Sequence, residues 1–478
     1  MVSAAPSLPA APVHREAYQL AVDARDPRFD GVFFVGITTT RVYCRPICPS
    51  RLAYDRHRRF FDSAAAAERA GFRPCLRCRP ELAPGAGAGG VGAGRTALGA
   101  VSRLAQVATQ RIAAGALNDR SVAELAGELG VSERHLRRAL EREIGVSPLG
   151  LAQTHRLLLA KRLLVDTDLS VTRVAFASGF QSLRRFNASF REQYGMPPSA
   201  VRRKTIVAPR PAAALHLTLA YRPPLAWDAL LDTLRAVATP GVEVFAGRRY
   251  GRTVRIAGHS GAVFAEDAPG NHVAVEVTPS LVPVLMPLIA GLRRLFDLDA
   301  EPAVVDAHLA LGGLGALVER RSGVRLPGAL DGFEVALQLL LRGRGCLGRV
   351  TAALGDPLES GVPRLTHLAP NAGRIAEAGV ARLVRLGVPP RRAAAVIALA
   401  RAVVGGQLRL EPGSDVAATR RALLDLGGIG ERLATWIVMR ALYWPDAFFS
   451  KDRALLGRAE AWRPWRAYAA MHLCLEDR

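Results

Sequence analysis

The sequence predicts a multidomain protein that is mostly α-helical, with modules that mix helices and strands. Two breaks in composition separate the modules: residues 84–94 read PGAGAGGVGAG, and residues 201–211 are basic and end in prolines. Between the breaks the apolar residues recur at helical spacing, and beyond the second break they alternate as in strands. At 478 residues the chain is long enough for about three domains of ~150 residues. We expect four modules and one flexible linker, with these bounds: 1–83, the linker 84–99, 100–203, 212–297 and 298–478.

The net charge limits the class of partner. The chain carries 64 Lys and Arg against 42 Asp and Glu, a net charge of +22, and its isoelectric point is near 11.0. An excess of this size indicates a polyanionic partner, and double-stranded DNA is the one we expect. Residues 1–29 lack the segments of a signal peptide, and no apolar run approaches the ~20 residues that cross a bilayer. We therefore expect a cytoplasmic protein with no membrane partner.

The first module contains two cysteine motifs with metal-ligand spacing. The module has two strand-like segments, 31–37 and 59–61, and one helix, 63–70. A domain this small usually needs a metal ion or disulfide bonds to stabilise it. Cys44-Arg-Pro-Ile-Cys48 and Cys75-Leu-Arg-Cys78 are separated by 26 residues and place four thiolates on two tight loops, which favours tetrahedral Zn²⁺. The spacing fits a purely structural zinc as well as a reactive one. The candidate phosphate contacts beside the motifs are Arg45, Arg51 and Arg73.

The second module repeats one pattern twice. Ser121-Val-Ala-Glu and Ser170-Val-Thr-Arg each begin a capped helix, which runs into a Gly turn and a second capped helix. This pattern is typical of a helix-turn-helix, and the second helices, 133–143 and 182–194, are the ones that would enter the major groove. A phosphate contact or plain solvation explains a single arginine here more simply than base readout. The candidate DNA contacts are Arg134, Arg137, Arg184 and Arg185.

The second half begins with strand-like alternation and continues as helices. Residues 215–219 and 273–277 alternate apolar with polar side chains, and helical stretches follow at 227–236 and 282–296, which predicts an α+β unit. The remainder has helical periodicity broken by Gly and Pro turns, so we expect an all-α module. Within it, Gly428-Ile429-Gly430 lies between two helices, where exposed backbone N–H groups can hold a DNA phosphate.

The first two modules resemble the Ada adaptive-response family. TTTRVYCRPICPSR and GFRPCLRCRPE are similar to segments of that family's N-terminal domain, and the doubled helix-turn-helix resembles the AraC-type domain that follows it. The resemblance implies that Cys44, Cys48, Cys75 and Cys78 bind Zn²⁺. It also implies that Cys44 irreversibly accepts a methyl group from a methylated DNA phosphate, in a bacterial transcription activator whose partners include RNA polymerase. Methylation would remove one negative charge at Cys44 and so raise the affinity for DNA.

The second half resembles the AlkA-type 3-methyladenine DNA glycosylases of the helix-hairpin-helix superfamily. The similarity runs from about residue 216 to 468 and includes RLFDLDAEP and WRPWRAYAAMHL. It implies a TBP-like fold for 212–297, release of alkylated purines, and a catalytic Asp452 that stabilises the positive charge developing on the sugar. The superfamily's Schiff-base lysine position is Arg432 here, so we expect a monofunctional enzyme that leaves an abasic site. Asp452 also fits the N-cap of a helix starting at Arg453, and the two roles are compatible.

Three departures from the AlkA pattern bear on activity. Gly427 stands where the hairpin usually has Pro, Leu341-Arg-Gly-Arg-Gly-Cys346 shortens the helix that supplies the family's DNA wedge, and Cys474 aligns with a tryptophan of the base pocket. The alternative function is a methylation-sensing activator whose glycosylase half has degenerated and only binds DNA. Buried aromatic residues are more often simple core, but three are candidates for the base pocket: Trp436, Tyr443 and Tyr468.

Overall fold

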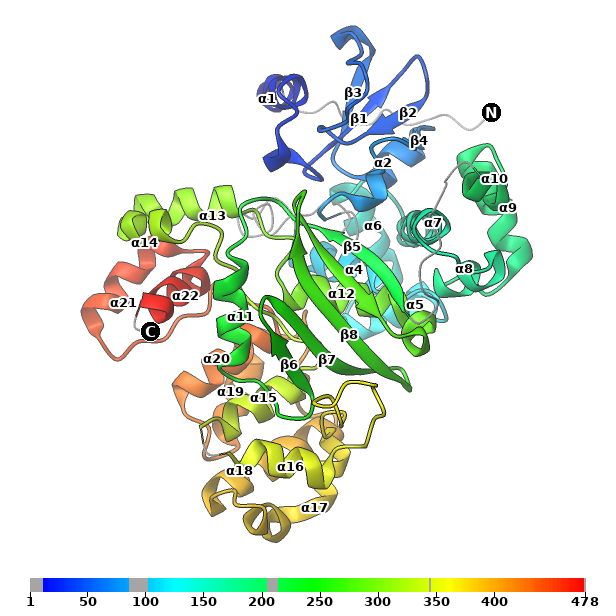
Figure 1. Ribbon diagram of the computed structural model, residues 1–478. Helices are drawn as coiled ribbons and strands as arrows, with labels where there is room; N and C mark the ends of the chain where they lie inside the picture. The colour runs from blue at the N-terminus through cyan, green and yellow to red at the C-terminus, as the bar shows by residue number, and fades with distance from the viewer. Residues whose placement is uncertain (1–11, 86–101, 204–213, 344, 477–478) are drawn as a thin grey trace.

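Four modules follow one another along the chain and pack together (Figure 1). The structure is a computed structural model that describes residues 12–85, 102–203, 214–343 and 345–476. Figure 1 shows the first module in blue at the top, the second in cyan and teal at the right, and the sheet of the third at the centre. The predicted linker 84–99 lies outside the described residues except for Pro84 and Gly85, as does the part of the second break after residue 203.

The first module is built on a four-stranded sheet with the order β3-β1-β2-β4, in which only β2 and β4 are parallel. Periodicity located β1, β3 and α2 approximately, but β2 and β4 have three and two residues, too few for a recognisable alternation. The elements are α1 (Pro12–Asp23), β1 (Phe34–Ile37), β2 (Val42–Cys44), β3 (Arg58–Phe61), α2 (Ala64–Arg69) and β4 (Arg73–Pro74).

The second module is all-α, as predicted, and its long central helix α7 joins two helix-turn-helix pairs, α5–α6 and α8–α9. Ser121 and Glu124 form a capping box at the start of α5, and Ser170 caps α8. The elements are α4 (Arg103–Ala113), α5 (Val122–Glu128), α6 (Glu133–Glu143), α7 (Pro148–Asp166), α8 (Val171–Ala177), α9 (Leu183–Tyr194) and α10 (Pro198–Arg203).

The third module is a five-stranded antiparallel sheet with the order β5-β9-β8-β7-β6 and two helices. Its buried residues form one continuous core with those of the second helix-turn-helix, from Leu157 to Val201 and from Leu215 to Leu298. The second module is therefore packed onto the sheet as part of the same core. The elements are β5 (Leu215–Ala220), α11 (Trp227–Arg235), β6 (Glu243–Ala246), β7 (Arg249–Ile256), β8 (His259–Ala268), β9 (His272–Val277) and α12 (Leu285–Leu295).

The fourth module is all-α and has two hydrophobic cores, one built from residues 333–442 and one from 305–326 with 439–475. The hairpin α19–α20 belongs mainly to the first core, and α22 belongs to the second. The elements are α13 (Pro302–Leu309), α14 (Gly315–Arg320), α15 (Gly332–Leu341), α16 (Cys346–Leu354), α17 (Ala372–Arg385), α18 (Pro390–Val404), α19 (Val416–Asp425), α20 (Glu431–Ala441), α21 (Arg453–Ala459) and α22 (Arg466–Glu476).

One helical stretch, Pro302–Arg320, has the length and apolar composition of a membrane-spanning helix, a test that core helices of soluble proteins also pass. Its backbone departs from helical geometry at Gly313, where φ is 88°. Val305 and Leu309 on this stretch are buried in the same cluster as Trp462. In this structure the stretch therefore contributes to the second core of the fourth module.

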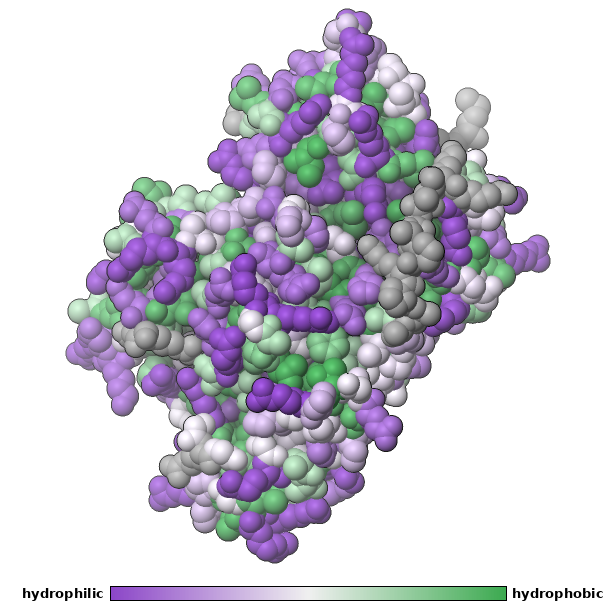
Figure 2. Space-filling view, in the orientation of Figure 1, coloured by the Kyte–Doolittle hydropathy of each residue, from purple (hydrophilic) through white to green (hydrophobic). Residues whose placement is uncertain are grey.

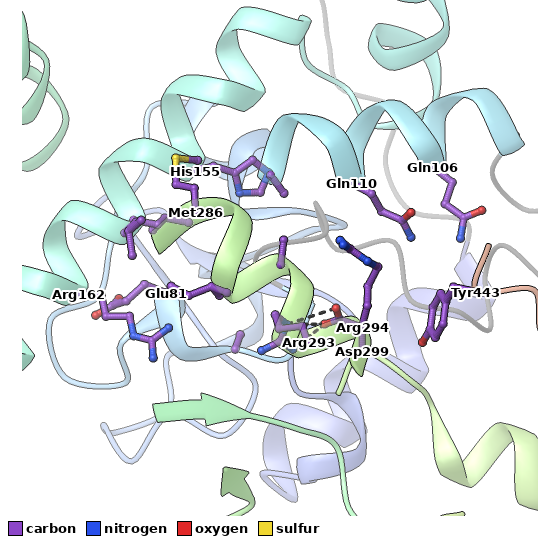
Figure 3. A pocket seen from close by; sticks show the side chains of 16 residues that line it. Glu81, Gln106, Gln110, His155, Arg162, Met286, Arg293, Arg294, Asp299 and Tyr443 are labelled. Carbon is purple, nitrogen blue, oxygen red and sulfur yellow. Dashed lines mark hydrogen bonds and ion pairs between the residues drawn. The ribbon is translucent and has the colours of Figure 1, made fainter. Parts of the chain in front are cut away.

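A small cavity of about 110 Å³ lies where the modules meet (Figure 3). It is bounded by α4 and α7 of the second module, by α12 of the third and by the end of the first. Arg293 donates to Asp299 across 3.0 Å at its wall, and burial lowers the pKa of His155 to about 4. Tyr443 reaches the same wall from the fourth module.

Candidate metal centre and DNA-binding sites

Parallel pairing of β2 with β4 brings the two cysteine motifs together. Tyr43 is in register with Pro74, and the Cys75 N–H donates to the Tyr43 carbonyl across 3.0 Å. Cys44 at the end of β2 and Cys75 after β4 therefore leave the sheet at the same edge. The four sulfur atoms of the two motifs lie within 4.8 Å of one another, and tetrahedral Zn²⁺ would place them about 3.8 Å apart. The donor set fits Zn²⁺.

Cys44 is the most exposed cysteine of the cluster. Cys48, Cys75 and Cys78 are buried, with 7–9% of their surface exposed, whereas Cys44 is partly exposed. The backbone N–H of Arg45 donates to Cys78 Sγ across 3.3 Å, and hydrogen bonds of this kind favour the thiolate form. Of the four cysteines, Cys44 is therefore the residue that solvent contacts most.

The arginines predicted to bind phosphate beside the cluster have different surroundings. Arg51 and Arg73 are exposed, and Figure 2 shows hydrophilic side chains over much of the visible surface of this module. Arg45 is held elsewhere: its Nε donates to Asp30 across 2.8 Å, its Nη1 donates to the Cys78 carbonyl, and its side chain is 12% exposed. The Arg45 guanidinium thus braces the metal loop, and its contact with DNA stays a prediction.

A buried ion pair attaches the metal loop to α7. Lys161 Nζ donates to Glu81 Oε2 across 2.6 Å and to the Cys75 carbonyl across 2.9 Å. Arg79 adds two hydrogen bonds to Asp166 at the end of the same helix, at 2.7 and 2.8 Å. The helix that joins the two helix-turn-helix units therefore contacts the backbone of a cysteine in the cluster. Sequence reasoning missed this contact, because a single lysine in an apolar helix gives no periodic signal.

Glu68 forms a second polar contact between these modules. Thr154 Oγ1 of α7 donates to its carboxylate across 2.6 Å, and Tyr43 OH donates across 2.9 Å. Burial raises the pKa of Glu68 to about 7, and the two hydroxyl donors oppose this shift. Tyr43 precedes Cys44, so both contacts connect α7 to the segments that carry the cysteines.

The four arginines predicted on the second helices of the helix-turn-helix pairs are exposed. Arg134 and Arg137 lie on α6, and Arg184 and Arg185 lie on α9. Arg137 pairs with Glu133 across 2.7 Å, one turn away on the same helix. Their inward neighbours, including Leu136 and Phe186, are fully buried, as expected. Each second helix therefore presents a basic face to solvent.

The turn between α19 and α20 leaves its glycines open. Gly427 and Gly428 have φ values of 67° and 75°, and Ile429 is buried at 4% exposure, which anchors the turn in the core. Gly430 caps α20 through its backbone alone, and a Cβ built on it meets no atom within 4 Å. The N–H groups at the start of α20 are thus unobstructed, as a phosphate site requires.

Asp452 caps α21 and is exposed. Its Oδ1 accepts from the Ala454 N–H across 2.8 Å, as the sequence indicated, and no described residue forms an ion pair with it. The neighbouring Asp446 differs, because Arg463 and Arg466 both bind it at 2.7 Å. Of the two acids in this segment, Asp452 is the one whose charge is available to a ligand.

A pocket of about 380 Å³ lies beside Asp452, and we refer to it as the α20–α22 pocket. Trp436 lines it, as predicted for a base pocket. Tyr443 and Tyr468 do not line it: both are hydrogen-bonded to the buried Asp297, Tyr468 across 2.8 Å, and their place in a base pocket stays a prediction. Sequence reasoning did not place in the pocket several residues that line it, including Arg432, Thr435, Phe448, Phe449, Lys451 and Leu473.

Three family models match successive parts of the chain. The metal binding domain of Ada matches residues 17–81, a helix-turn-helix domain matches 125–204, and the AlkA N-terminal domain matches 216–331. Their order along the chain is the order of the modules in the structure. The third match extends past the sheet to the start of the fourth module.

Known proteins resemble the chain over its length and in its parts. The probable bifunctional transcriptional activator/DNA repair enzyme AlkA of Mycobacterium tuberculosis is 36% identical over 481 residues, covering 95% of this chain and 94% of that protein. DNA-3-methyladenine glycosylase 2 of Escherichia coli is 32% identical over 276 residues, 54% of this chain and 95% of that protein. The bifunctional transcriptional activator/DNA repair enzyme Ada of Escherichia coli is 30% identical over 176 residues, 37% of this chain and 46% of that protein.

Proposed function

This chain belongs to the family of bifunctional transcriptional activators and DNA repair enzymes that combine an Ada-type module with AlkA, and we propose two separate reactions on alkylated DNA for it. In the first, Cys44 takes a methyl group from a methylated backbone phosphate. In the second, the fourth module hydrolyses the N-glycosidic bond of an alkylated purine such as 3-methyladenine and leaves an abasic site. The observation that carries the proposal is a four-thiol cluster with one partly exposed cysteine, on the same chain as an exposed Asp452 that forms no ion pair with any described residue.

In the methyl transfer, Cys44 Sγ attacks the methyl carbon of the phosphotriester. An S–C bond forms, the O–CH₃ bond breaks, and the phosphate regains its negative charge. Cys44, Cys48, Cys75 and Cys78 would hold Zn²⁺, which would keep the Cys44 sulfur deprotonated at neutral pH. Exposed Arg51 and Arg73 are the candidates for holding the neighbouring phosphates. The product is a neutral thioether at Cys44, so the repulsion between the cluster and DNA falls.

The base-release step uses groups of the hairpin and of α21. Backbone N–H groups at Gly428 and Gly430 hold a DNA phosphate, and the Asp452 carboxylate stabilises the oxocarbenium character of the sugar. Arg432 occupies the superfamily's Schiff-base lysine position, and a guanidinium does not become a neutral nucleophile, so strand cleavage is not part of the reaction.

The regulatory part of the proposal uses α6 and α9. We propose that their exposed arginines bind promoter DNA more tightly once Cys44 is methylated, and that the bound protein activates RNA polymerase in the bacterial cytoplasm. The direct test is the affinity of the methylated and unmethylated full chain for one duplex at one salt concentration. Tighter binding by the methylated protein supports the switch, and equal affinity contradicts it.

The second candidate function is an activator whose fourth module binds DNA without reacting. The shortened segment between α15 and α16 and the Cys474 position favour it. The test measures bases released from methylated DNA by the wild-type protein and by Asp452→Asn. Release that depends on Asp452 supports the enzyme, and no release by the wild type leaves the regulator.

A further inference from the structure

Three buried nitrogen atoms without hydrogen-bond partners line one small cavity. It is the cavity of about 110 Å³ between α4, α7 and α12, and we call it the junction cavity (Figure 3). The atoms are His155 Nε2, Arg162 Nε and Arg294 Nε, and none has a partner among the described residues. A buried polar atom without a partner costs free energy, and in native proteins such atoms are usually satisfied by water, an ion or a ligand. Three of them on one wall indicate that the junction cavity takes an occupant.

Both acidic side chains on the wall of the junction cavity are neutralised within the protein. Glu81 is paired with Lys161 across 2.6 Å. Asp299 accepts from Arg293 Nε across 3.0 Å, and Figure 3 shows this pair at the cavity wall. The acids of the wall therefore leave no negative charge for a further cation.

Two of the three nitrogens belong to side chains that add hydrogen bonds and no free positive charge. His155 is neutral at pH 7, because burial lowers its pKa to about 4. Arg162 donates to the Thr218 carbonyl and lies 3.9 Å from Asp166, so its charge already has a counterpart.

Arg294 is the cation of the wall whose charge has no counterpart. None of the described residues forms a hydrogen bond or ion pair with its guanidinium. Figure 3 shows its side chain extending from α12 toward Gln110 of α4. The charge of Glu411 also reaches Arg294, but Arg111 binds that carboxylate across 2.9 Å. Burial lowers the pKa of Arg294, as expected for a cation without a partner, and a guanidinium stays protonated at neutral pH.

The rest of the wall is apolar, and it limits the occupant in size and type. Leu158 of α7 and Met286, Ile289 and Ala290 of α12 supply this surface. A volume of about 110 Å³ is the space of roughly four water molecules at ~30 Å³ each, which suits a carboxylate on a short hydrocarbon body. The two oxygens of a carboxylate match two parallel N–H groups of a guanidinium. A phosphate would bring two further oxygens against apolar side chains.

The junction cavity has a path to solvent. Gln110, Met286 and Arg294 also line an adjoining groove of about 720 Å³ between the second module and the C-terminal half of the chain. Arg294 is partly exposed, as expected for a residue that faces both spaces. A small anion can therefore reach the guanidinium through the groove.

We propose that the junction cavity binds a short-chain carboxylate, with its two oxygens on the Arg294 guanidinium and its hydrocarbon body against α7 and α12. The site is separate from the two reactions proposed above. All four modules contribute to its wall, from Ala83 of the first to Tyr443 of the fourth. An occupant would therefore stabilise the packing of the modules, because it binds only where they meet. Ordered water alone on the three nitrogens is the competing interpretation.

The experiment uses butyrate as the probe and butyramide as its neutral counterpart of the same size. Ligand-observed NMR on the full zinc-loaded chain gives a dissociation constant for each at constant ionic strength, with inorganic phosphate as a third ligand. Arg294→Met removes the charge and keeps the reach of the side chain, and Ala290→Leu fills the cavity and keeps the charge. Arg385→Met, which removes an exposed charge from α17 outside the cavity, is the matched control.

We expect butyrate to bind with a dissociation constant on the order of 1 mM, and about tenfold or more tightly than butyramide or phosphate. Arg294→Met and Ala290→Leu should each weaken butyrate binding by about tenfold or more, and Arg385→Met should leave it unchanged. Without ligand, Arg294→Met should unfold at the temperature of the wild type or above it, since a cation without a partner is removed, so its loss of binding is not a loss of fold.

Four outcomes overturn the proposal. They are no saturable binding of butyrate, equal affinity for butyramide, tighter binding of phosphate than of butyrate, and unchanged butyrate affinity in Arg294→Met. The first of them assigns the three nitrogens to ordered water.

Discussion

Lys161 and Glu81 form a buried ion pair 2.6 Å long between α7 and the segment that follows the cysteine cluster, and each side chain is 1% exposed. Lys161 also donates to the carbonyl of Cys75. A burial this complete makes the pair sensitive to the loss of one partner, because the remaining charge has no water to solvate it. These two contacts of Lys161 join the segment that carries Cys75 to α7, the helix between the two helix-turn-helix units.

Lys161→Met should therefore destabilise the protein, by less than the about 3–5 kcal/mol that an uncompensated buried charge costs, because Glu81 keeps an ion pair with Arg79 across 3.1 Å. The measurement is the free energy of unfolding at saturating zinc. Glu81→Gln should cost less stability in the Lys161→Met background than in wild type, because the contact with Lys161 is already lost and only the pair with Arg79 remains to be broken. If Glu81→Gln lowers the free energy of unfolding by the same amount in the Lys161→Met background as in wild type, the two residues are not coupled.

Gly430→Ala should weaken DNA binding by about tenfold while costing less than about 1 kcal/mol of stability. The added methyl group meets no protein atom within 4 Å, and it adds bulk at the N-cap residue of α20, beside the proposed phosphate site. Duplex affinity and thermal unfolding are measured on the same preparation. Gly428→Ala is the contrasting variant, because its φ of 75° strains an alanine and should lower stability. Unchanged affinity in Gly430→Ala would place the phosphate elsewhere.

Asp452→Asn should abolish most base release, by about 10²–10³-fold, with little change in stability. Asparagine accepts the Ala454 N–H as well as aspartate does, so the cap of α21 remains. Asp452→Ala should lose both the activity and the cap. If Asp452→Asn retains wild-type release rates, the carboxylate has only the capping role.

Asp297 should make stability depend on pH below neutrality. Burial raises its pKa from 3.8 to about 6, against the opposing effect of Arg325 and of its tyrosine donors. The folded state thus binds a proton that the unfolded state has lost between about pH 4 and 6. Stability from this group is highest below pH 4 and falls by about 3 kcal/mol as pH rises through 6.

The measurement for Asp297 is the difference in unfolding free energy between wild type and Asp297→Asn at several pH values with saturating zinc. The advantage of the wild type should shrink as pH rises from 5 to 7. A difference that is constant over this range would mean that the carboxyl has the same pKa in the folded and unfolded states.

The sequence predicted the elements whose signal is local. Paired cysteines at metal spacing, serine caps before apolar periodicity, and a Gly-Ile-Gly turn located the cluster, both helix-turn-helix units and the hairpin. Alternation at residues 215–219 and 273–277 located β5 and β9. These features depend on residues that are close in sequence, and periodicity or spacing is enough to detect them.

Features that depend on distant partners were missed. The pairing of Arg45 with Asp30 and the hydrogen bonds from Tyr443 and Tyr468 to Asp297 were not predicted. An ion pair between segments leaves no pattern in a single sequence, so side chains of the same type cannot be sorted into free and engaged ones. The same limit hid Lys161, whose partner lies 80 residues away.

The most direct test of the account is to map the methyl group after zinc-loaded protein reacts with duplex DNA that carries methylphosphotriesters. Intact mass gives the number of groups transferred, and peptide mass spectrometry gives the residue. The account predicts one methyl group per chain, on Cys44, the partly exposed cysteine of the cluster. A methyl group on Cys48, Cys75 or Cys78, or no transfer by protein that retains its zinc, would contradict it.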